Sequence, residues 1–97
     1  MRIIAIKTIR NFWLKHSDAE QPLRAWFAEA KKANWKNPAD ITKQYRTASI
    51  LKNNRVVFNI KGNDYRLVAA INYDFKIVYI RFIGTHKEYD KINAKEI

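Results

Sequence analysis

The chain has 97 residues, of which 47% are hydrophobic, and it contains no cysteine. This length can supply one compact hydrophobic core but not two, so we expect a single domain spanning residues 1–97. The absence of cysteine excludes a disulfide framework, and with only two histidines, His16 and His86, no zinc site of ordinary ligand spacing can be assembled. We therefore expect no metal and no cofactor.

Basic residues outnumber acidic ones by a wide margin. Lys and Arg number 19 and Asp and Glu number 9, which gives a net charge of +10. Such a surplus favours a polyanionic partner, either nucleic acid or an acidic protein. No run of about 18 apolar residues is present, and Arg2, Lys7 and Arg10 interrupt the beginning too often for a secretory signal. We expect a cytoplasmic protein with no membrane association.

The first elements in chain order are a strand and a helix. Residues 2–7 form a short β-branched run, and because it is apolar on both faces we expect a central strand. Thr8 can then cap a helix. Positions i, i+3, i+4 and i+7 of that helix form one stripe, made of Ile9, Phe12, Trp13 and His16.

A second helix is expected next. Ser17 with Glu20 three residues later matches a capping box, although Pro22 makes the exact beginning uncertain. The apolar stripe of this helix consists of Leu23, Trp26, Phe27 and Ala30. The two amphipathic helices are predicted to pack on one face of a sheet, and Trp13 and Trp26 are predicted to be core or partner contacts.

The second half of the chain is typical of β-structure. Residues 34–54 lack a sustained period and are predicted to hold a short helical or irregular piece between turns at residues 37–38 and 53–54. Three strands are expected at residues 55–60, 65–72 and 76–83, joined by turns at residues 62–63 and around Asp74. This pattern predicts an antiparallel meander.

Alternation assigns side chains to the two faces of these strands. Arg66 is placed on one face of its strand, with Val68 and Ala70, and the last strand is predicted to have a shared face made of Ile77, Tyr79, Arg81 and Ile83. Whether Arg66 and Arg81 share a sheet face depends on strand register, which sequence does not fix.

The most informative stretch is residues 79–90, where a hydrophobic strand runs into a cluster of phosphate-binding and proton-transferring side chains. Arg81 and Lys87 can neutralise phosphate, His86 can exchange a proton near neutral pH, and Tyr89 offers a stacking face or a hydroxyl. This density indicates an RNA-cleaving site. Each residue also has an ordinary structural interpretation: the arginine as a solvated or paired side chain, His86 as a turn cap, and Tyr89 as part of the core.

Three strings of residues resemble a known family. They are Y-R-L-V at residues 65–68, V-F-N-I followed by a Gly-Asn turn at residues 57–63, and G-T-H-K-E-Y-D at residues 84–90. Together with the order of the elements, they resemble the HigB-type toxins of the RelE-like superfamily in bacterial toxin–antitoxin systems. The resemblance implies an α+β fold in the order β-α-α-β-β-β-short α, with a mainly antiparallel sheet and two N-terminal helices on one face.

The resemblance also implies a function. Such toxins are endoribonucleases that cut mRNA, typically on the translating ribosome, and a cognate HigA-type antitoxin with a helix-turn-helix domain silences them. It further implies that the toxin–antitoxin complex binds operator DNA. Carried over by position, the implied catalytic residues are Arg66, Arg81, His86 and Tyr89.

The chemistry can be argued from the residues alone, because RNA supplies its own nucleophile in the 2′-hydroxyl next to the scissile phosphate. Arg66 and Arg81 suit the stabilisation of phosphate charge, and His86 suits proton transfer, which typically contributes about 10² to 10⁴-fold. A metal is not required. We expect the RNA backbone to be held by Lys52, Lys61 and Lys87.

Two other functions remain open at this point. A non-catalytic RNA- or ribosome-binding module would need the same basic surface without the proton chemistry. A small interaction protein would use that surface only to bind an acidic partner. Loss of cleavage with retained binding in a His86 variant distinguishes the nuclease from the module, and the salt dependence of RNA affinity distinguishes both from a protein-only binder.

Overall fold

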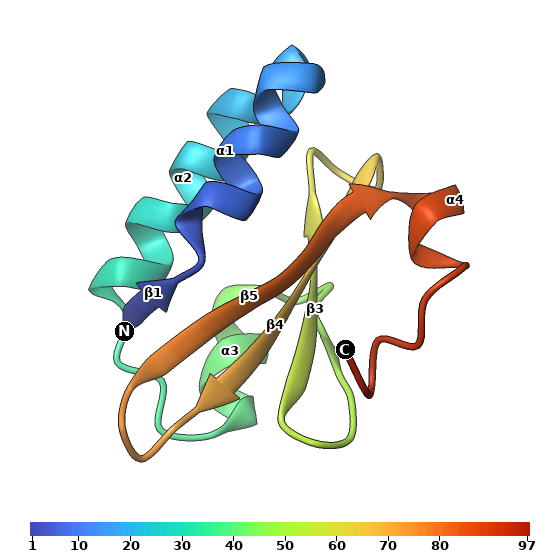
Figure 1. Ribbon diagram of the computed structural model, residues 1–97. Coiled ribbons are helices and arrows are strands. Elements are labelled where there is room, and N and C mark those ends of the chain that lie inside the picture. Colours follow the sequence, from blue (N-terminus) through green and yellow to red (C-terminus); the bar gives the residue numbers. More distant parts are fainter.

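A computed structural model describes residues 1–97 (Figure 1). One short 3-10 turn, Ser17–Ala19, lies between the first two helices. The elements in chain order are β1 (Arg2–Ile4), α1 (Ile6–Lys15), α2 (Glu20–Lys32), α3 (Pro38–Gln44), β2 (Ser49–Ile50), β3 (Arg55–Ile60), β4 (Tyr65–Asn72), β5 (Ile77–Thr85) and α4 (His86–Tyr89).

The strands form one five-stranded sheet in the order β1-β5-β4-β3-β2. β1 runs parallel to β5, and every other pairing is antiparallel. In Figure 1, α1 and α2 lie side by side at one edge of the sheet, whereas α4 and the C-terminal segment lie at the other side. The predicted α+β fold with a mainly antiparallel sheet is confirmed, as is the meander of β3, β4 and β5.

The helices cover one face of the sheet through a single large core. Ile9 of α1, Trp26 of α2 and Ile41 of α3 belong to the same buried cluster as Phe58 and Leu67 of the sheet. A smaller cluster lies on the opposite face, where Val57, Val68 and Ala94 are packed with side chains of the C-terminal segment. Both faces are therefore partly covered, the first by helices and the second by residues after β5.

The predicted central position of the first strand is wrong. β1 is only three residues long and lies at the edge of the sheet. The strand ends because Ala5 adopts a left-handed conformation (φ 71°), after which α1 begins at Ile6. Ile3 is buried in the core even though the strand has only one neighbour. The apolar run thus reflects burial by the helices rather than a place in the middle of the sheet.

Both predicted helix caps are also wrong. α1 has Ala5 at its N-cap, so Thr8 lies within its first turn, and α2 begins at Glu20 without a side-chain cap. Pro22 explains the second difference. If Ser17 capped the helix, Pro22 would occupy the fifth helical position, where its missing N–H would remove a hydrogen bond. With the helix beginning at Glu20, Pro22 falls in the first turn, where no partner is needed.

Turns in the second half follow from local chemistry. Asn37 caps α3 by accepting a hydrogen bond from the Asp40 backbone at 3.1 Å, and Pro38 occupies the first helical position. Asn53 and Asn54 both have positive φ (61° and 59°), the conformation that tight β-hairpins require. The expected short helical piece and the turn after it are both present.

A β-bulge changes the faces of β5. The register shifts between Val68 and Ala69, so that Val68 pairs with Phe82 and Ala69 pairs with Ile80. Arg81 is therefore the extra residue of the bulge. Tyr79 pairs with Ala70 and Ile83 pairs with Leu67, which places them on opposite faces. The predicted shared face of Ile77, Tyr79, Arg81 and Ile83 is consequently wrong.

As for membranes, none of the helices has the length and apolar character needed for a transmembrane span.

Candidate functional site

The candidate site lies where β4, the end of β5 and α4 meet. Strand register pairs Arg66 of β4 with Asn59 of β3 on one side and with Gly84 of β5 on the other. Directly paired residues in antiparallel strands project from the same face of the sheet. Arg66 therefore projects from the face opposite the helices, because its neighbour Leu67 belongs to the helix-covered core.

Arg66 and Tyr89 are in contact. The guanidinium carbon of Arg66 lies 5.0 Å from the centre of the Tyr89 ring, a cation–π distance. The Tyr89 ring is in turn 6.5 Å from the ring of Phe82 on β5. Two of the four predicted catalytic residues, 23 positions apart in the numbering, are thus brought together by the β4–β5 pairing and by the turn into α4.

Two buried polar atoms beside this contact have no hydrogen-bond partner within the protein. They are Nε of Arg66 and Oδ1 of Asn59, which face the same side of the sheet. The other polar atom of Asn59 is used, since Nδ2 donates to the Thr47 carbonyl at 3.1 Å. Most buried polar atoms in folded proteins are paired. An unpaired donor and acceptor on neighbouring strands leave this cluster able to bind polar groups of a ligand.

A capping box holds α4 against β5. The Thr85 hydroxyl accepts a hydrogen bond from the Glu88 backbone at 3.3 Å, and the Glu88 carboxylate accepts one from the Thr85 backbone at 2.8 Å. The Thr85 backbone hydrogen bond keeps the pKa of Glu88 below its usual value, with a smaller contribution from the charge of His16. This arrangement fixes the beginning of α4, and with it the positions of His86 and Tyr89.

Gly84 allows α4 to fold back this closely. A β-carbon at position 84 would lie 2.6 Å from the end of the Phe82 ring and 3.0 Å from a carboxylate oxygen of Glu88. Any larger residue must displace one of these side chains. The small size of Gly84, rather than a special backbone angle, is therefore what the site requires.

His86 and Arg81 lie at the edges of this arrangement. His86 is the first residue of α4 and is half-exposed. Arg81 is exposed at the β-bulge. Measured along the strands, the backbone of Arg81 is two to three residue positions from that of Arg66, which corresponds to a separation on the order of 7–10 Å. The structure therefore joins Arg66 of β4 with Tyr89 of α4 directly, and it places Arg81 on the neighbouring strand β5 and His86 at the beginning of α4.

The three predicted RNA-binding lysines occupy different surroundings. Lys87 is exposed on α4, next to the site. Lys61 lies in the β3–β4 turn and is paired with Asp18 at 2.7 Å and with Asp64 at 3.4 Å. The hydrogen bond to Asp18 raises the pKa of Lys61, so the lysine stays charged but is already balanced by carboxylates. Lys52 lies in the turn at the other end of β3, and the length of that strand separates it from Lys61 by roughly 20 Å.

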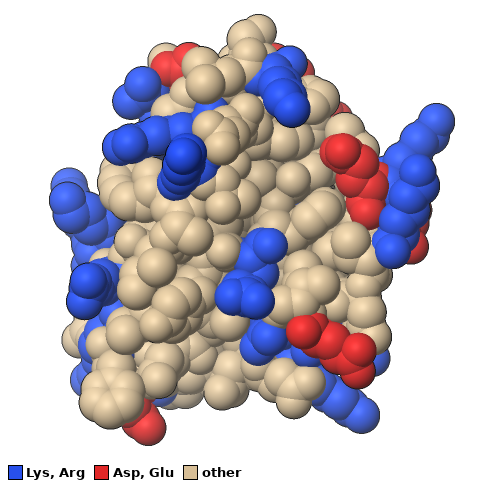
Figure 2. Space-filling view, in the orientation of Figure 1, with Lys and Arg blue, Asp and Glu red and all other residues tan.

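Charge on the molecule as a whole is strongly basic. On the face shown in Figure 2, Lys and Arg side chains occur around the edge and in the middle, while Asp and Glu are confined to a few small patches. No group of three or more His, Asp or Glu side chains is arranged so that it could hold a metal ion. The site is therefore one of guanidinium, imidazole and phenol groups on a basic surface.

Residues 19–92 match the HigB toxin family, described as the RelE-like toxic component of a toxin–antitoxin system. The chain belongs to this HigB toxin family. The resemblance to HigB-type toxins that the sequence indicated is thereby confirmed. All seven residues predicted for catalysis and RNA binding lie within the matched range.

Individual relatives agree with the family match. The mRNA interferase toxin HigB of Escherichia coli strain K12 is 29% identical over 96 residues, which cover 97% of this chain and 92% of the relative. The mRNA interferase HigB of Shigella flexneri shows the same identity and coverage. An mRNA interferase HigB of Escherichia coli O6:H1 is 24% identical over 94 residues, or 95% of this chain and 91% of the relative.

Sequence reasoning did not identify Asn59 and Gly84 as part of the site in this HigB family member. One signal for Asn59 was available, because asparagine is depleted in strands and here lies inside an otherwise apolar run. Gly84 was visible as the last small residue before the polar string. Its packing role depends on how closely α4 returns to β5, which no local pattern reveals.

Proposed function

We propose that this toxin is an endoribonuclease that cleaves mRNA on the translating ribosome, by metal-independent attack of the 2′-hydroxyl on the scissile phosphate. The single observation that carries the proposal is the Arg66–Tyr89 contact with its unpaired Nε beside Asn59. A fixed guanidinium with a free donor suits a phosphate oxygen. The relatives named mRNA interferases support RNA as the substrate.

The chemical steps can be assigned to the residues near this contact. A base takes the proton of the 2′-hydroxyl, the 2′-oxygen attacks phosphorus, and the bond from phosphorus to the 5′-oxygen breaks as that oxygen receives a proton. The products are a 2′,3′-cyclic phosphate and a 5′-hydroxyl. Arg66 and Arg81 stabilise the extra negative charge on the phosphate, and His86 transfers a proton. Tyr89 aligns Arg66 and offers its hydroxyl to the reacting groups or its free edge to a base.

RNA positioning is assigned to the lysines. Lys87 is adjacent to the catalytic groups and contributes most directly. Lys61 and Lys52 lie further out and act through the electrostatic attraction of the backbone, with Lys61 weakened by its two carboxylate partners. Mutation of Lys87 should therefore weaken RNA affinity more than mutation of either other lysine.

The biological setting is part of the proposal, and membership of a toxin family supports it. The proposed partner is a HigA-type antitoxin with a helix-turn-helix domain, and the complex is proposed to bind operator DNA. Ribosomes and mRNA lie in the cytoplasm, which is the proposed location of the active toxin. A single catalytic domain covering residues 1–97 is part of the same proposal.

A translation reaction with a defined mRNA tests the proposal. Wild type, His86→Ala and Arg81→Ala are compared with and without ribosomes by mapping RNA 5′ ends. Arg2→Ala serves as a matched control, because it removes one exposed positive charge at the far end of the sheet. We expect ribosome-dependent cuts in wild type and in the control, and loss of cuts in the other two variants. Intact mRNA with a folded wild-type protein that still binds RNA would instead support a non-catalytic RNA-binding module.

A further inference from the structure

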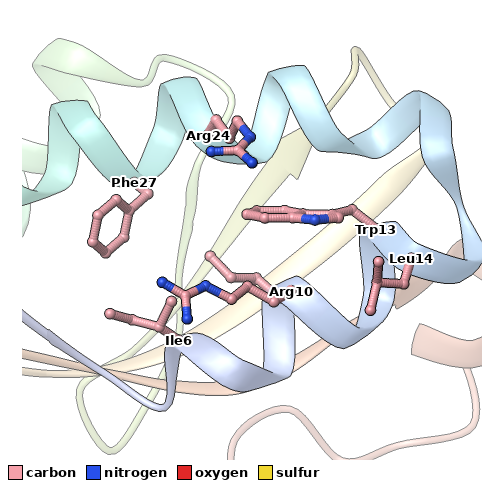
Figure 3. A pocket seen from close by; sticks show the side chains of 7 residues that line it. Ile6, Arg10, Trp13, Leu14, Arg24 and Phe27 are labelled. Carbon is pink, nitrogen blue, oxygen red and sulfur yellow. The ribbon is translucent and has the colours of Figure 1, made fainter.

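A groove runs between α1 and α2 on the outside of the helical layer. Its volume is about 470 Å³. Figure 3 shows side chains from both helices converging on it, and these are Ile6, Arg10, Trp13 and Leu14 from α1 and Arg24 and Phe27 from α2. None of these residues belongs to the candidate RNA site.

The groove is apolar where a folded surface is usually polar. The side chain of Leu14 is 77% exposed at one end of the groove, although it lies in a helix whose apolar stripe already serves the core. Trp13 and Phe27 are only half-buried. Clustered exposed apolar groups of this kind mark interaction surfaces more often than single exposed residues do.

The rim of the groove is basic. Arg24 lies with its guanidinium carbon 4.9 Å from the Trp13 ring and is paired with Glu20 at 2.8 Å, so its position is fixed. Arg10 is exposed and takes part in none of the ion pairs of the protein. A ligand with an apolar stripe flanked by carboxylates would therefore match the apolar floor and find an unpaired guanidinium at its side.

We propose that this α1–α2 groove is the docking site of the antitoxin, which inserts an amphipathic helix with acidic residues beside its apolar stripe. The inference rests on the proposed function only in that the partner is the antitoxin of a toxin–antitoxin system. Helix-in-groove binding uses apolar anchors at helical spacing, and partly exposed Trp and Arg residues are the usual centres of such interfaces. An apolar floor with an exposed leucine favours a protein helix over an RNA backbone.

The position of the groove has a consequence for inhibition. α1 has α2 and the groove on one flank, and its other flank faces the end of β5 and α4, where Phe12, His16, Ile83 and Glu88 line a separate small hollow. An antitoxin helix in the groove would leave Arg66 and Tyr89 uncovered. The bound toxin would then be silenced by the bulk of the antitoxin rather than by contact with the catalytic groups.

Binding of the purified antitoxin from the same system tests the proposal by calorimetry. Leu14→Glu places a like charge against the acidic helix, and Phe75→Glu is its matched control, because Phe75 is 76% exposed in the β4–β5 turn. We expect Leu14→Glu to weaken binding at least tenfold and Phe75→Glu to change it less than twofold. Equal affinities for wild type and Leu14→Glu would overturn the proposal.

Crosslinking provides a second measurement that does not depend on affinity. Because the chain has no cysteine, Leu14→Cys and Phe75→Cys each give one position for a benzophenone label. The label at position 14 should crosslink to the antitoxin, and the label at position 75 should not. Crosslinking of position 14 to a second toxin copy or to RNA, instead of to the antitoxin, would overturn the assignment of the occupant.

These outcomes are separable from failure of the proposed function. RNA cleavage by free Leu14→Glu should equal that of wild type, and at least tenfold more antitoxin should be needed to inhibit it. If the wild type does not cleave mRNA, the proposed activity is wrong, yet the binding and crosslinking results still decide whether the groove holds the antitoxin.

Discussion

Replacement of Gly84 by alanine should damage the site by moving α4 away from β5. The added methyl group would meet the end of the Phe82 ring at 2.6 Å and the Glu88 side chain at 3.0 and 3.1 Å. The 2.6 Å separation is too short for a real contact, and the separations of 3.0 and 3.1 Å are tighter than most, so Phe82 must shift and Glu88 is crowded. Glu88 is half of the capping box that begins α4, and Phe82 packs beside Tyr89. Either shift would change how Tyr89 meets Arg66.

The expected magnitudes follow from this geometry. Overpacking of a tight contact typically costs about 1–3 kcal/mol of unfolding free energy, which a domain with about 5–15 kcal/mol of stability survives. Displacement of a catalytic group by about 1 Å can lower a rate on the order of 10²-fold. We therefore expect Gly84→Ala to stay folded, with its unfolding free energy lowered by about 2 kcal/mol and its cleavage rate reduced by roughly 10- to 100-fold.

The chain provides its own control in Gly62, its second glycine. Gly62 has φ +63° in the β3–β4 turn and has nothing within 4 Å of the position of a new β-carbon. Alanine there should cost about 1–2 kcal/mol through backbone strain alone. Urea unfolding and single-turnover cleavage of an mRNA on programmed ribosomes should show two variants of similar stability, of which only Gly84→Ala is slow. Equal cleavage by both variants would refute the reasoning.

Three further predictions concern the site and its support. Arg66→Lys keeps the charge but loses the planar fork, so single-turnover cleavage should fall at least tenfold while circular dichroism stays unchanged; full activity would show that charge alone suffices. Thr85→Ala removes the cap on the Glu88 amide and should cost about 1 kcal/mol, seen as faster hydrogen exchange confined to α4; unchanged exchange would contradict the capping role. Hydrogen bonds from Lys61 and then Tyr65 hold the pKa of Asp18 below its usual value, so its ionised form stabilises the fold above an unfolded pKa of about 3.9. This stabilisation is lost as pH falls through the folded pKa, and the gap in unfolding free energy between wild type and Asp18→Asn should narrow from pH 5 to pH 3; a constant gap would rule out the linkage.

Elements with a strong period were predictable, and their exact ends were less so. β3 and β4 have the predicted bounds because alternation and turn residues coincide there, and β5 differs by one residue at its beginning and two at its end. The stripes of α1 and α2 were also correct, except that His16 lies at the C-cap, just after the end of α1. The beginnings of these helices were not correct, because neither helix uses a side-chain cap. A left-handed alanine before α1 and a short 3-10 turn before α2 leave no recognisable signal in the sequence.

The residues of the candidate site could be named from the sequence, but their arrangement could not. The string at residues 84–90 supplied His86 and Tyr89, and the strand pattern supplied Arg66. Their arrangement depends on the β4–β5 register and on the bulge at Arg81, which comes from the packing of the two strands rather than from any residue type. The charge of Lys61 is balanced partly by Asp18, which is 43 residues earlier in the chain, and no local pattern predicts such a pair.

The unpaired atoms of Asn59 and Arg66 connect the stability of this fold to its proposed function. Each buried polar atom without a partner costs about 1–3 kcal/mol relative to a paired one, and apolar residues would fit the strand pattern of β3 and β4 better. The rest of β3 follows that pattern closely, since Val56, Val57 and Phe58, the three residues before Asn59, are buried. A fold that keeps a donor and an acceptor unsatisfied at one cross-strand pair is less stable than it could be. The cost is offset if a phosphate and a base of the RNA bind to these two atoms. Because neither atom has a partner within the protein, no existing hydrogen bond has to break when the ligand binds.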